Sequence, residues 1–84
     1  MGQNRKLLLR VLSGTQDSSI RFAELQKLLE LLGFSVRIKG DHFIYTNPQV
    51  EEIINIQPLG DKAKPYQVKQ VRHIVLKYKF GGDL

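Results

Sequence analysis

The sequence predicts an α+β fold, in which helices cover one face of a three-stranded antiparallel sheet. Apolar residues recur at helical spacing near both ends of the chain, whereas the middle alternates apolar and polar residues with a period of two. The expected order is helix, helix, strand, strand, strand, helix, and it lets every apolar stripe face one core. With 84 residues, of which 42% are hydrophobic, the chain is expected to form a single domain spanning residues 1–84.

Two amphipathic helices are expected before the sheet. The first spans about residues 5–13, and the second begins after a cap at Ser18 or Ser19 and ends at Gly33. Each helix has one apolar stripe, formed by Leu7, Leu8, Val11 and Leu12 in the first and by Phe22, Leu25, Leu28, Leu29 and Leu32 in the second. The core of the domain is expected over about residues 20–80, which makes the first helix an addition to it.

A tight hairpin is expected at the centre of the chain. Residues 34–39 and 42–46 predict two strands joined by Gly40 and Asp41. Glycine suits the first central position of a type II′ turn, because that position has a positive φ. The register of such a hairpin places His42 on the uncovered face of the sheet, together with Arg37 and Lys39. The opposite face is expected to be filled by Phe34, Val36, Ile38, Phe43 and Tyr45.

A third strand and a last helix are expected after the hairpin. The strand spans residues 51–57 and ends at Pro58, and a polar loop over residues 59–64 leads to a helix that begins at Pro65. The apolar stripe of this helix consists of Val68, Val71, Ile74, Val75 and Tyr78, and its opposite side carries Lys69, Arg72, His73 and Lys77. Residues 80–84 are expected to fray.

Positive charge gathers at the C-terminal end. Of the net charge of +5, residues 60–84 carry +4 and the rest of the chain carries +1. A basic region of this kind indicates a polyanionic partner, nucleic acid first, and a basic face that only keeps the protein soluble is an equal alternative.

Several classes of protein are excluded by what the sequence lacks. The chain has no cysteine, which excludes disulfides and thiolate metal sites, and its two histidines have no metal-ligand spacing. There is no Gly-x-Ser-x-Gly motif of a serine hydrolase, and no apolar run long enough to span a bilayer. We therefore expect a cytoplasmic protein without a metal or another cofactor, and without a membrane partner.

His42, next to Arg37 and Lys39, suits one reaction in particular. Cleavage of RNA without metal requires a base that removes the 2′-hydroxyl proton and cations that hold the phosphate. Histidine is suited to be the base, because its ordinary pKa of about 6.5 leaves most of it neutral at pH 7. The alternative is a surface histidine without a task.

Five pieces of the chain follow one another in a recognisable order: a leucine-rich helix, Gly-Phe, a basic strand, Gly-x-His and a basic helix. They are Leu25-Gln26-Lys27-Leu28-Leu29, Gly33-Phe34, Arg37-Ile38-Lys39, Gly40-Asp41-His42 and Lys69-Gln70-Val71-Arg72. In these pieces the chain resembles the HicA family of toxins, which are mRNA interferases of bacterial and archaeal toxin–antitoxin pairs.

This resemblance implies a fold like that of a double-stranded-RNA-binding domain and a metal-independent endoribonuclease activity on mRNA. It also implies a HicB-type antitoxin that covers the active histidine. The catalytic histidine of the family corresponds to His42, and Gly40 corresponds to its turn former. The chain departs from the family pattern at Asp41, where serine is common, and at Gln57-Pro58, where many members have a histidine. Asp41 could orient the imidazole or repel phosphate.

Three hypotheses follow. In the first, the protein is a toxin ribonuclease, in which His42 is the general base or acid and His73 is a less favoured second acid–base group. Its RNA-binding cations are Arg37, Lys39, Lys62, Lys64, Lys69 and Arg72. In the second, the same fold binds RNA without cleaving it. In the third, it is a basic protein-interaction domain that meets an acidic partner through the last helix and the exposed Ile44.

Overall fold

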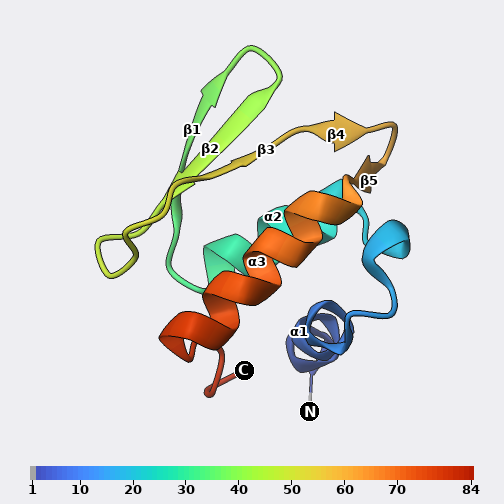
Figure 1. Cartoon of the computed structure of the whole chain (residues 1–84), viewed down its shortest axis with the longest axis vertical. Coiled ribbons are helices and arrows are strands. Elements are labelled where there is room, and N and C mark those ends of the chain that lie inside the picture. The colour runs from blue at the N-terminus through green and yellow to red at the C-terminus, as the bar shows by residue number, and fades with distance from the viewer. Residues whose placement is uncertain (1) are drawn as a thin grey trace.

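A computed structural model describes residues 2–84 and shows three helices packed beside a three-stranded sheet (Figure 1). The chain passes in order through α1 (Gln3–Ser13), the short 3-10 helix η1 (Asp17–Ser19), α2 (Phe22–Leu31), β1 (Ser35–Lys39), β2 (His42–Thr46), β3 (Ile54–Ile56), β4 (Pro58–Leu59), β5 (Lys62–Ala63) and α3 (Pro65–Tyr78). The predicted α+β class and its order of three helices and three sheet strands are confirmed.

The sheet has the order β1-β2-β3, with both pairs antiparallel. In the β1–β2 hairpin Lys39 lies opposite His42 and Val36 opposite Tyr45, as predicted. Gly40 has a φ of 62°, and Asp41 keeps a negative φ, which is the combination that a type II′ turn requires. The turn therefore sets the register that places His42 on the outer face of the sheet, the face away from the helices.

The helices cover only part of the inner face of the sheet. Tyr45, Ile54 and Ile56 on β2 and β3 are fully buried against the helices. Val36 and Ile38 on β1 point to the same face but remain 42% and 59% exposed. Val36 and Ile38 lie on the predicted face, but the prediction that the helices cover that face is wrong for these two residues. The hairpin extends past the helical layer, and the side chains of Val36 and Ile38 are only partly covered (Figure 1).

The start of α2 differs from the prediction, whereas the start of α3 agrees with it. Ser18 and Ser19 belong to η1, and α2 begins after Arg21, whose backbone N–H donates to the Glu24 carboxylate at 2.9 Å. Glutamate at the third helical position accepts the N–H of the N-cap residue, which is one half of a capping box, whereas a serine cap would accept the N–H of the second or third helical residue. α3 begins at Pro65, where the missing N–H of proline leaves no hydrogen bond unmade.

The segment between β3 and α3 is more ordered than expected. The third strand covers only Ile54–Ile56, and the expected polar loop contains the β4–β5 hairpin. β5 also pairs with the segment that precedes α2, because the N–H of Phe22 donates to Asp61 O and that of Ala63 to Ile20 O, both at 2.9 Å. These backbone bonds join elements about 40 residues apart, so the local pattern could not predict them.

The C-terminal tail packs instead of fraying. The ring of Phe80 meets that of Phe34 edge-on, with centroids 5.9 Å apart. Gly81 lies so close to Leu8 of α1 that an added Cβ would be 2.7 Å from a leucine methyl carbon. Arg5 of α1 also donates to the backbone oxygen of Leu84 at 3.2 Å. The tail and α1 thus hold each other in place beside α3.

Candidate functional site

A group of polar side chains surrounds His42 on the outer face of the sheet. We call Asp41, His42, Asn55, Gln57 and Lys64 the His42 cluster. The imidazole is 46% exposed at the start of β2. Its Nδ1 is 3.2 Å from Oδ1 of Asn55, and its Nε2 is 3.4 Å from Nε2 of Gln57. Both ring nitrogens therefore have a polar partner from the third strand or the residue directly after it.

These two contacts indicate which ring nitrogen carries the proton. An amide oxygen only accepts hydrogen bonds, so Nδ1 of His42 must donate its N–H to Asn55. An amide nitrogen only donates, so Nε2 must offer its lone pair to Gln57. Neutral His42 is then the Nδ1–H tautomer, with an accepting Nε2 on the accessible side of the sheet. An accepting nitrogen of this kind is what a general base needs.

Asp41 and Lys64 meet at the Gln57 side chain. The Gln57 amide nitrogen donates to Oδ2 of Asp41 at 3.3 Å, and the Gln57 amide oxygen accepts from Nζ of Lys64 at 3.2 Å. Oδ1 of Asp41 lies 3.7 Å from Nε2 of His42. The Asp41 carboxylate thus lies beside the accepting nitrogen of His42, and its side chain is 71% exposed.

Gln67 of α3 fixes the strand that carries Asn55 and Gln57. Its side chain is only 1% exposed; its Oε1 accepts the Gln57 backbone N–H at 3.2 Å, and its Nε2 donates to the Asn55 backbone oxygen at 3.5 Å. A buried amide whose two ends are both paired holds its neighbours in one geometry. α3 thus positions the two amides that contact the imidazole.

Sequence reasoning gave Asn55, Gln57 and Gln67 no role at the site, and it noted Gln57 only as standing where many family members have a histidine. The signal for the first two is the alternation Ile54-Asn55-Ile56-Gln57, which puts the isoleucines inward and the amides on the outer face. The β2–β3 register then brings Asn55 opposite Ile44, two residues from His42. Gln67 gives no such signal. Its place on the helix does not show that its side chain is buried and bonded to the backbone of Asn55 and Gln57.

The predicted RNA-binding cations fall into two groups. Arg37 and Lys39 share the outer face with His42, and Lys64 joins the His42 cluster through Gln57. Lys62 lies in β5, two residues before Lys64, and Lys69 is exposed on α3. His73 is exposed one helical turn beyond Lys69. Two of the six predicted cations therefore share a face with His42, a third reaches its cluster through Gln57, and the positive charge continues along the chain toward α3.

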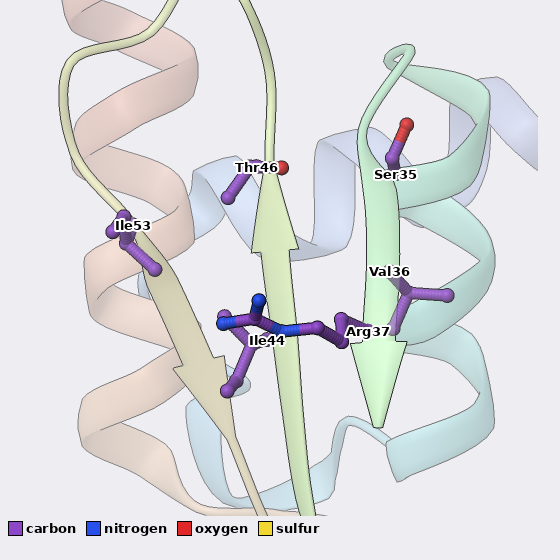
Figure 2. Close-up of a pocket in the computed structure, with 6 residues that line it drawn as sticks. All are labelled: Ser35, Val36, Arg37, Ile44, Thr46 and Ile53. Carbon is purple, nitrogen blue, oxygen red and sulfur yellow. The ribbon is translucent and has the colours of Figure 1, made fainter. Parts of the chain in front are cut away.

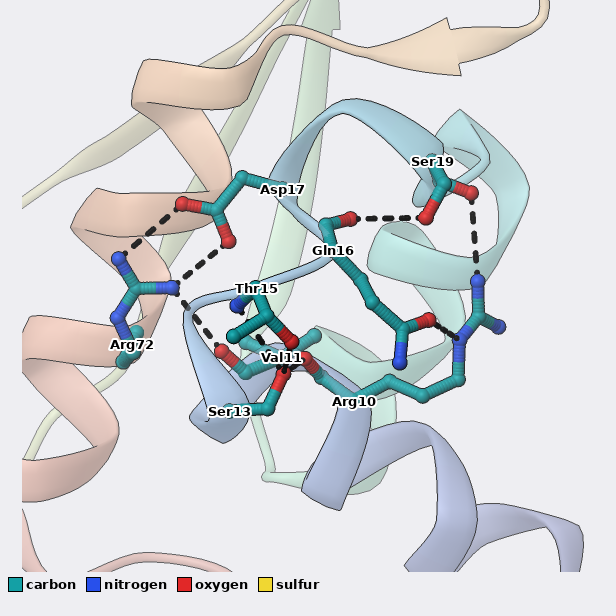
Figure 3. Close-up of polar contacts among 8 residues, drawn as sticks. All are labelled: Arg10, Val11, Ser13, Thr15, Gln16, Asp17, Ser19 and Arg72. Carbon is teal, nitrogen blue, oxygen red and sulfur yellow. Dashed lines mark hydrogen bonds and ion pairs between the residues drawn. The ribbon is translucent and has the colours of Figure 1, made fainter.

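Arg72 differs from the other predicted cations. Its guanidinium donates to both carboxylate oxygens of Asp17, at 2.8 and 3.1 Å, and to the backbone oxygen of Val11 at 3.1 Å (Figure 3). We call Arg72, Asp17 and the Val11 carbonyl the Arg72 cluster. The Arg72 side chain is only 15% exposed, and the hydrogen bonds that it donates to Asp17 raise its pKa. The sequence predicts an RNA contact at Arg72; in the structure its guanidinium is paired with the Asp17 carboxylate and joins α3 to the N-terminal segment.

A shallow groove of about 210 Å³ lies on the outer face of the sheet, next to the His42 cluster but not including it. In Figure 2 the Arg37 side chain runs from β1 across β2, over Ile44, toward β3. The groove is lined by Ser35, Val36, Arg37, Ile44, Thr46 and Ile53. The outer face of the sheet therefore combines a polar end, at His42, with an apolar region crossed by a cation.

Within residues 2–84 no three or more side chains of the metal-binding types gather at one place. Over the same range no helix is long and apolar enough to cross a membrane.

Comparison with protein families identifies the chain. The family model described as the HicA toxin of bacterial toxin–antitoxin matches residues 22–78, which include every member of the His42 cluster. The chain belongs to the HicA toxin family. The family is one of toxins that act in toxin–antitoxin pairs, with an antitoxin as partner, and that are generally ribonucleases. No curated protein and no solved structure matched the chain. In this HicA protein α1 and η1 precede the matched residues.

Proposed function

We propose that this HicA toxin is a metal-independent endoribonuclease that cleaves mRNA with His42 as its single catalytic histidine. The main support is the half-exposed imidazole of His42, whose Nε2 accepts a hydrogen bond from Gln57 while Asn55 holds the Nδ1 proton. The cations Arg37 and Lys39 lie on the same face of the sheet. A base and nearby positive charge are the two requirements for cleavage through the 2′-hydroxyl.

The proposed reaction begins when Nε2 of His42 removes the proton of a 2′-hydroxyl. The freed oxygen attacks the adjacent phosphorus, and the bond from phosphorus to the 5′-oxygen of the next nucleotide breaks. The imidazolium then returns its proton to that leaving oxygen, so one histidine is base and acid in turn. The products are a 2′,3′-cyclic phosphate and a 5′-hydroxyl. Asp41, 3.7 Å from Nε2, stabilises the imidazolium while it exists.

The Gln57 side chain indicates where the substrate enters. Its amide N–H points at Nε2 of His42, the place that the 2′-hydroxyl must take to give up its proton. Gln57 therefore moves aside when RNA binds, and Lys64, which holds its amide oxygen at 3.2 Å, becomes free for a phosphate. Arg37 and Lys39 neutralise the reacting phosphate, and Lys62 and Lys69 follow the RNA backbone.

The experiment is cleavage of a defined RNA in excess chelator by three purified proteins: the wild type, His42→Ala and His73→Ala. We expect His42→Ala to cleave at least about 1,000-fold more slowly, within the range that general acid–base catalysis contributes. His73→Ala is the matched control, because it removes the other histidine, which is exposed on α3, and it should cleave like the wild type.

Equal cleavage by His42→Ala would contradict the catalytic assignment. Tight, salt-sensitive RNA binding without any cleavage by the wild type would instead favour an RNA-binding module that has no catalytic step. As the partner we propose a HicB-type antitoxin, and as the place of action the cytoplasm, where mRNA is translated.

A further inference from the structure

The free edge of the sheet at β1 has the properties of a docking site for an extended segment. β1 is an edge strand of the sheet: among the described strands only β2 pairs with it, so its other edge has no neighbouring strand. All five residues of the strand, Ser35–Lys39, are exposed. An uncovered edge of this kind offers unpaired N–H and C=O groups to another chain.

The turn identifies which backbone groups are free. In a two-residue hairpin the residues that flank the turn, here Lys39 and His42, form a hydrogen-bonded pair, and the pairs alternate from there. Arg37 and Lys39 therefore bond to β2, whereas Val36 and Ile38 direct their N–H and C=O groups outward. The same two residues expose 42% and 59% of their surface. The edge thus combines free hydrogen-bonding groups with two uncovered apolar side chains.

The charges on β1 select the partner. Arg37 and Lys39 stand on one face of the strand, and Val36 and Ile38 on the other. Cross-strand neighbours share a face, so a complementary strand would alternate carboxylates with apolar residues. A second copy of this chain is disfavoured as the partner. An antiparallel pair of β1 strands centred on Arg37 would place the two positively charged Arg37 side chains directly opposite each other. RNA has no backbone amides with which to extend a sheet.

We propose that the antitoxin adds an extended, acidic segment along the free edge of β1, as an additional strand of the sheet. This inference rests on the antitoxin partnership in the proposed function. The groove on the outer face continues the same surface, since Ile44 and Ile53 offer apolar contacts there and Arg37 crosses it (Figure 2). Strand addition of this kind takes affinity from backbone hydrogen bonds and specificity from alternate side chains.

Such docking would inhibit the ribonuclease through its cations. Lys39 is the register partner of His42, so a carboxylate paired with Lys39 would lie next to the proposed site. The antitoxin segment and the RNA backbone would then compete for Arg37 and Lys39. Inhibition by this route does not require that the antitoxin contact the imidazole itself.

The first test compares Val36→Pro with Val36→Ala in binding to the purified antitoxin, without RNA. Proline is tolerated on an edge strand where its missing N–H would face outward, and Val36→Ala removes the side chain but keeps the N–H. We expect Val36→Pro to bind about tenfold more weakly than Val36→Ala, because one N–H of the new strand pair is lost and its carbonyl partner is left unpaired. Both variants should cleave RNA like the wild type.

The second test needs no variant. Amide hydrogen exchange at Val36 and Ile38 should slow at least about tenfold when the wild-type toxin binds the antitoxin. Unchanged exchange at both amides in the assembled complex, together with equal binding of the Pro and Ala variants, would overturn the inference. Slow exchange that depends on toxin concentration without antitoxin would overturn it in favour of self-pairing. Neither measurement uses RNA cleavage, so the edge and the ribonuclease proposal fail separately.

Discussion

Two polar clusters of this protein have opposite character. In the Arg72 cluster the guanidinium and the Asp17 carboxylate meet through two bonds of 2.8 and 3.1 Å, and their side chains are 15% and 21% exposed. In the His42 cluster the contacts of the imidazole are 3.2 to 3.7 Å long, and His42 and Asp41 are 46% and 71% exposed. Both clusters join residues far apart in the chain.

The difference in contact length and exposure indicates a different role for each cluster. Short, bidentate, shielded bonds hold two elements in one arrangement, as the Arg72 cluster does for α3 and the N-terminal segment (Figure 3). Longer contacts in open solvent are easily exchanged for those of a ligand. The His42 cluster is therefore available to a substrate, and a basic side chain alone does not indicate RNA binding.

The largest expected effect on stability is at Arg72. Arg72→Met should lower the free energy of unfolding by about 2 kcal/mol, because it leaves the carboxylate of Asp17 and the carbonyl of Val11 without their partner. This corresponds to a fall in Tm of about 10 °C in thermal unfolding. His42→Ala should change the same free energy by less than about 0.5 kcal/mol. Equal losses in both variants would remove the contrast between the clusters.

The next effect concerns Asn55 as a positioning residue. Asn55→Ala removes the acceptor 3.2 Å from Nδ1 of His42, so the imidazole loses its fixed tautomer and orientation. We expect kcat for RNA cleavage to fall about tenfold, which corresponds to about 1.4 kcal/mol, with KM changed less than about twofold. A loss expressed mainly in KM would indicate a role in RNA binding instead.

A smaller effect is expected at Lys64, which lies beside His42 through Gln57. Lys64→Gln should weaken RNA binding a few-fold and make the log–log salt dependence of the binding constant shallower by about 0.7, the value for one phosphate contact on a single strand. Lys27→Gln is the matched control, since Lys27 is exposed on α2, outside the proposed RNA surface. Identical salt slopes in both variants would exclude Lys64 as a phosphate contact.

The smallest effect is expected at Glu52, a half-buried residue that pairs with Lys77 and Tyr78. Hydrogen bonds from Lys77 and from the Tyr78 hydroxyl lower the pKa of the Glu52 carboxyl from 4.5 to about 2. A carboxyl whose pKa is lower in the folded protein stabilises the fold at pH values above its ordinary pKa of 4.5. This stabilisation is lost as the pH falls through about 2. Glu52→Gln should thus lower Tm slightly at pH 7 and not below pH 2. If the Tm of Glu52→Gln stayed below that of the wild type at a pH under 2, the cause would not be the charge of the carboxylate.

Much of the fold and one part of the site could be predicted from the sequence. Gly40 and Asp41 define the turn type, and the turn type defines a register that places His42 on the outer face. The apolar stripes likewise locate all three helices, although α1 extends from Gln3 to Ser13, beyond the expected bounds. These features depend on neighbours a few residues apart, which a local pattern records.

The rest depends on contacts between distant residues. Asp17 and Arg72 are 55 residues apart, and nothing in a helical pattern tells a paired arginine from the exposed Lys69 nearby. Gln67 and Asn55 meet in the same way across the chain. The β1 edge was predicted as covered because alternation indicates which residues share a face, but not how far the helices reach over it.

The most direct test of the proposed role of His42 uses two RNA oligonucleotides in excess chelator, identical except for a single 2′-deoxy nucleotide at the cleavage position. Our proposal predicts that the wild-type protein cleaves the all-ribose strand to a 2′,3′-cyclic phosphate and a 5′-hydroxyl and leaves the deoxy position intact. Cleavage at the deoxy position, or a requirement for added divalent metal, would contradict attack by the 2′-oxygen with His42 as the base.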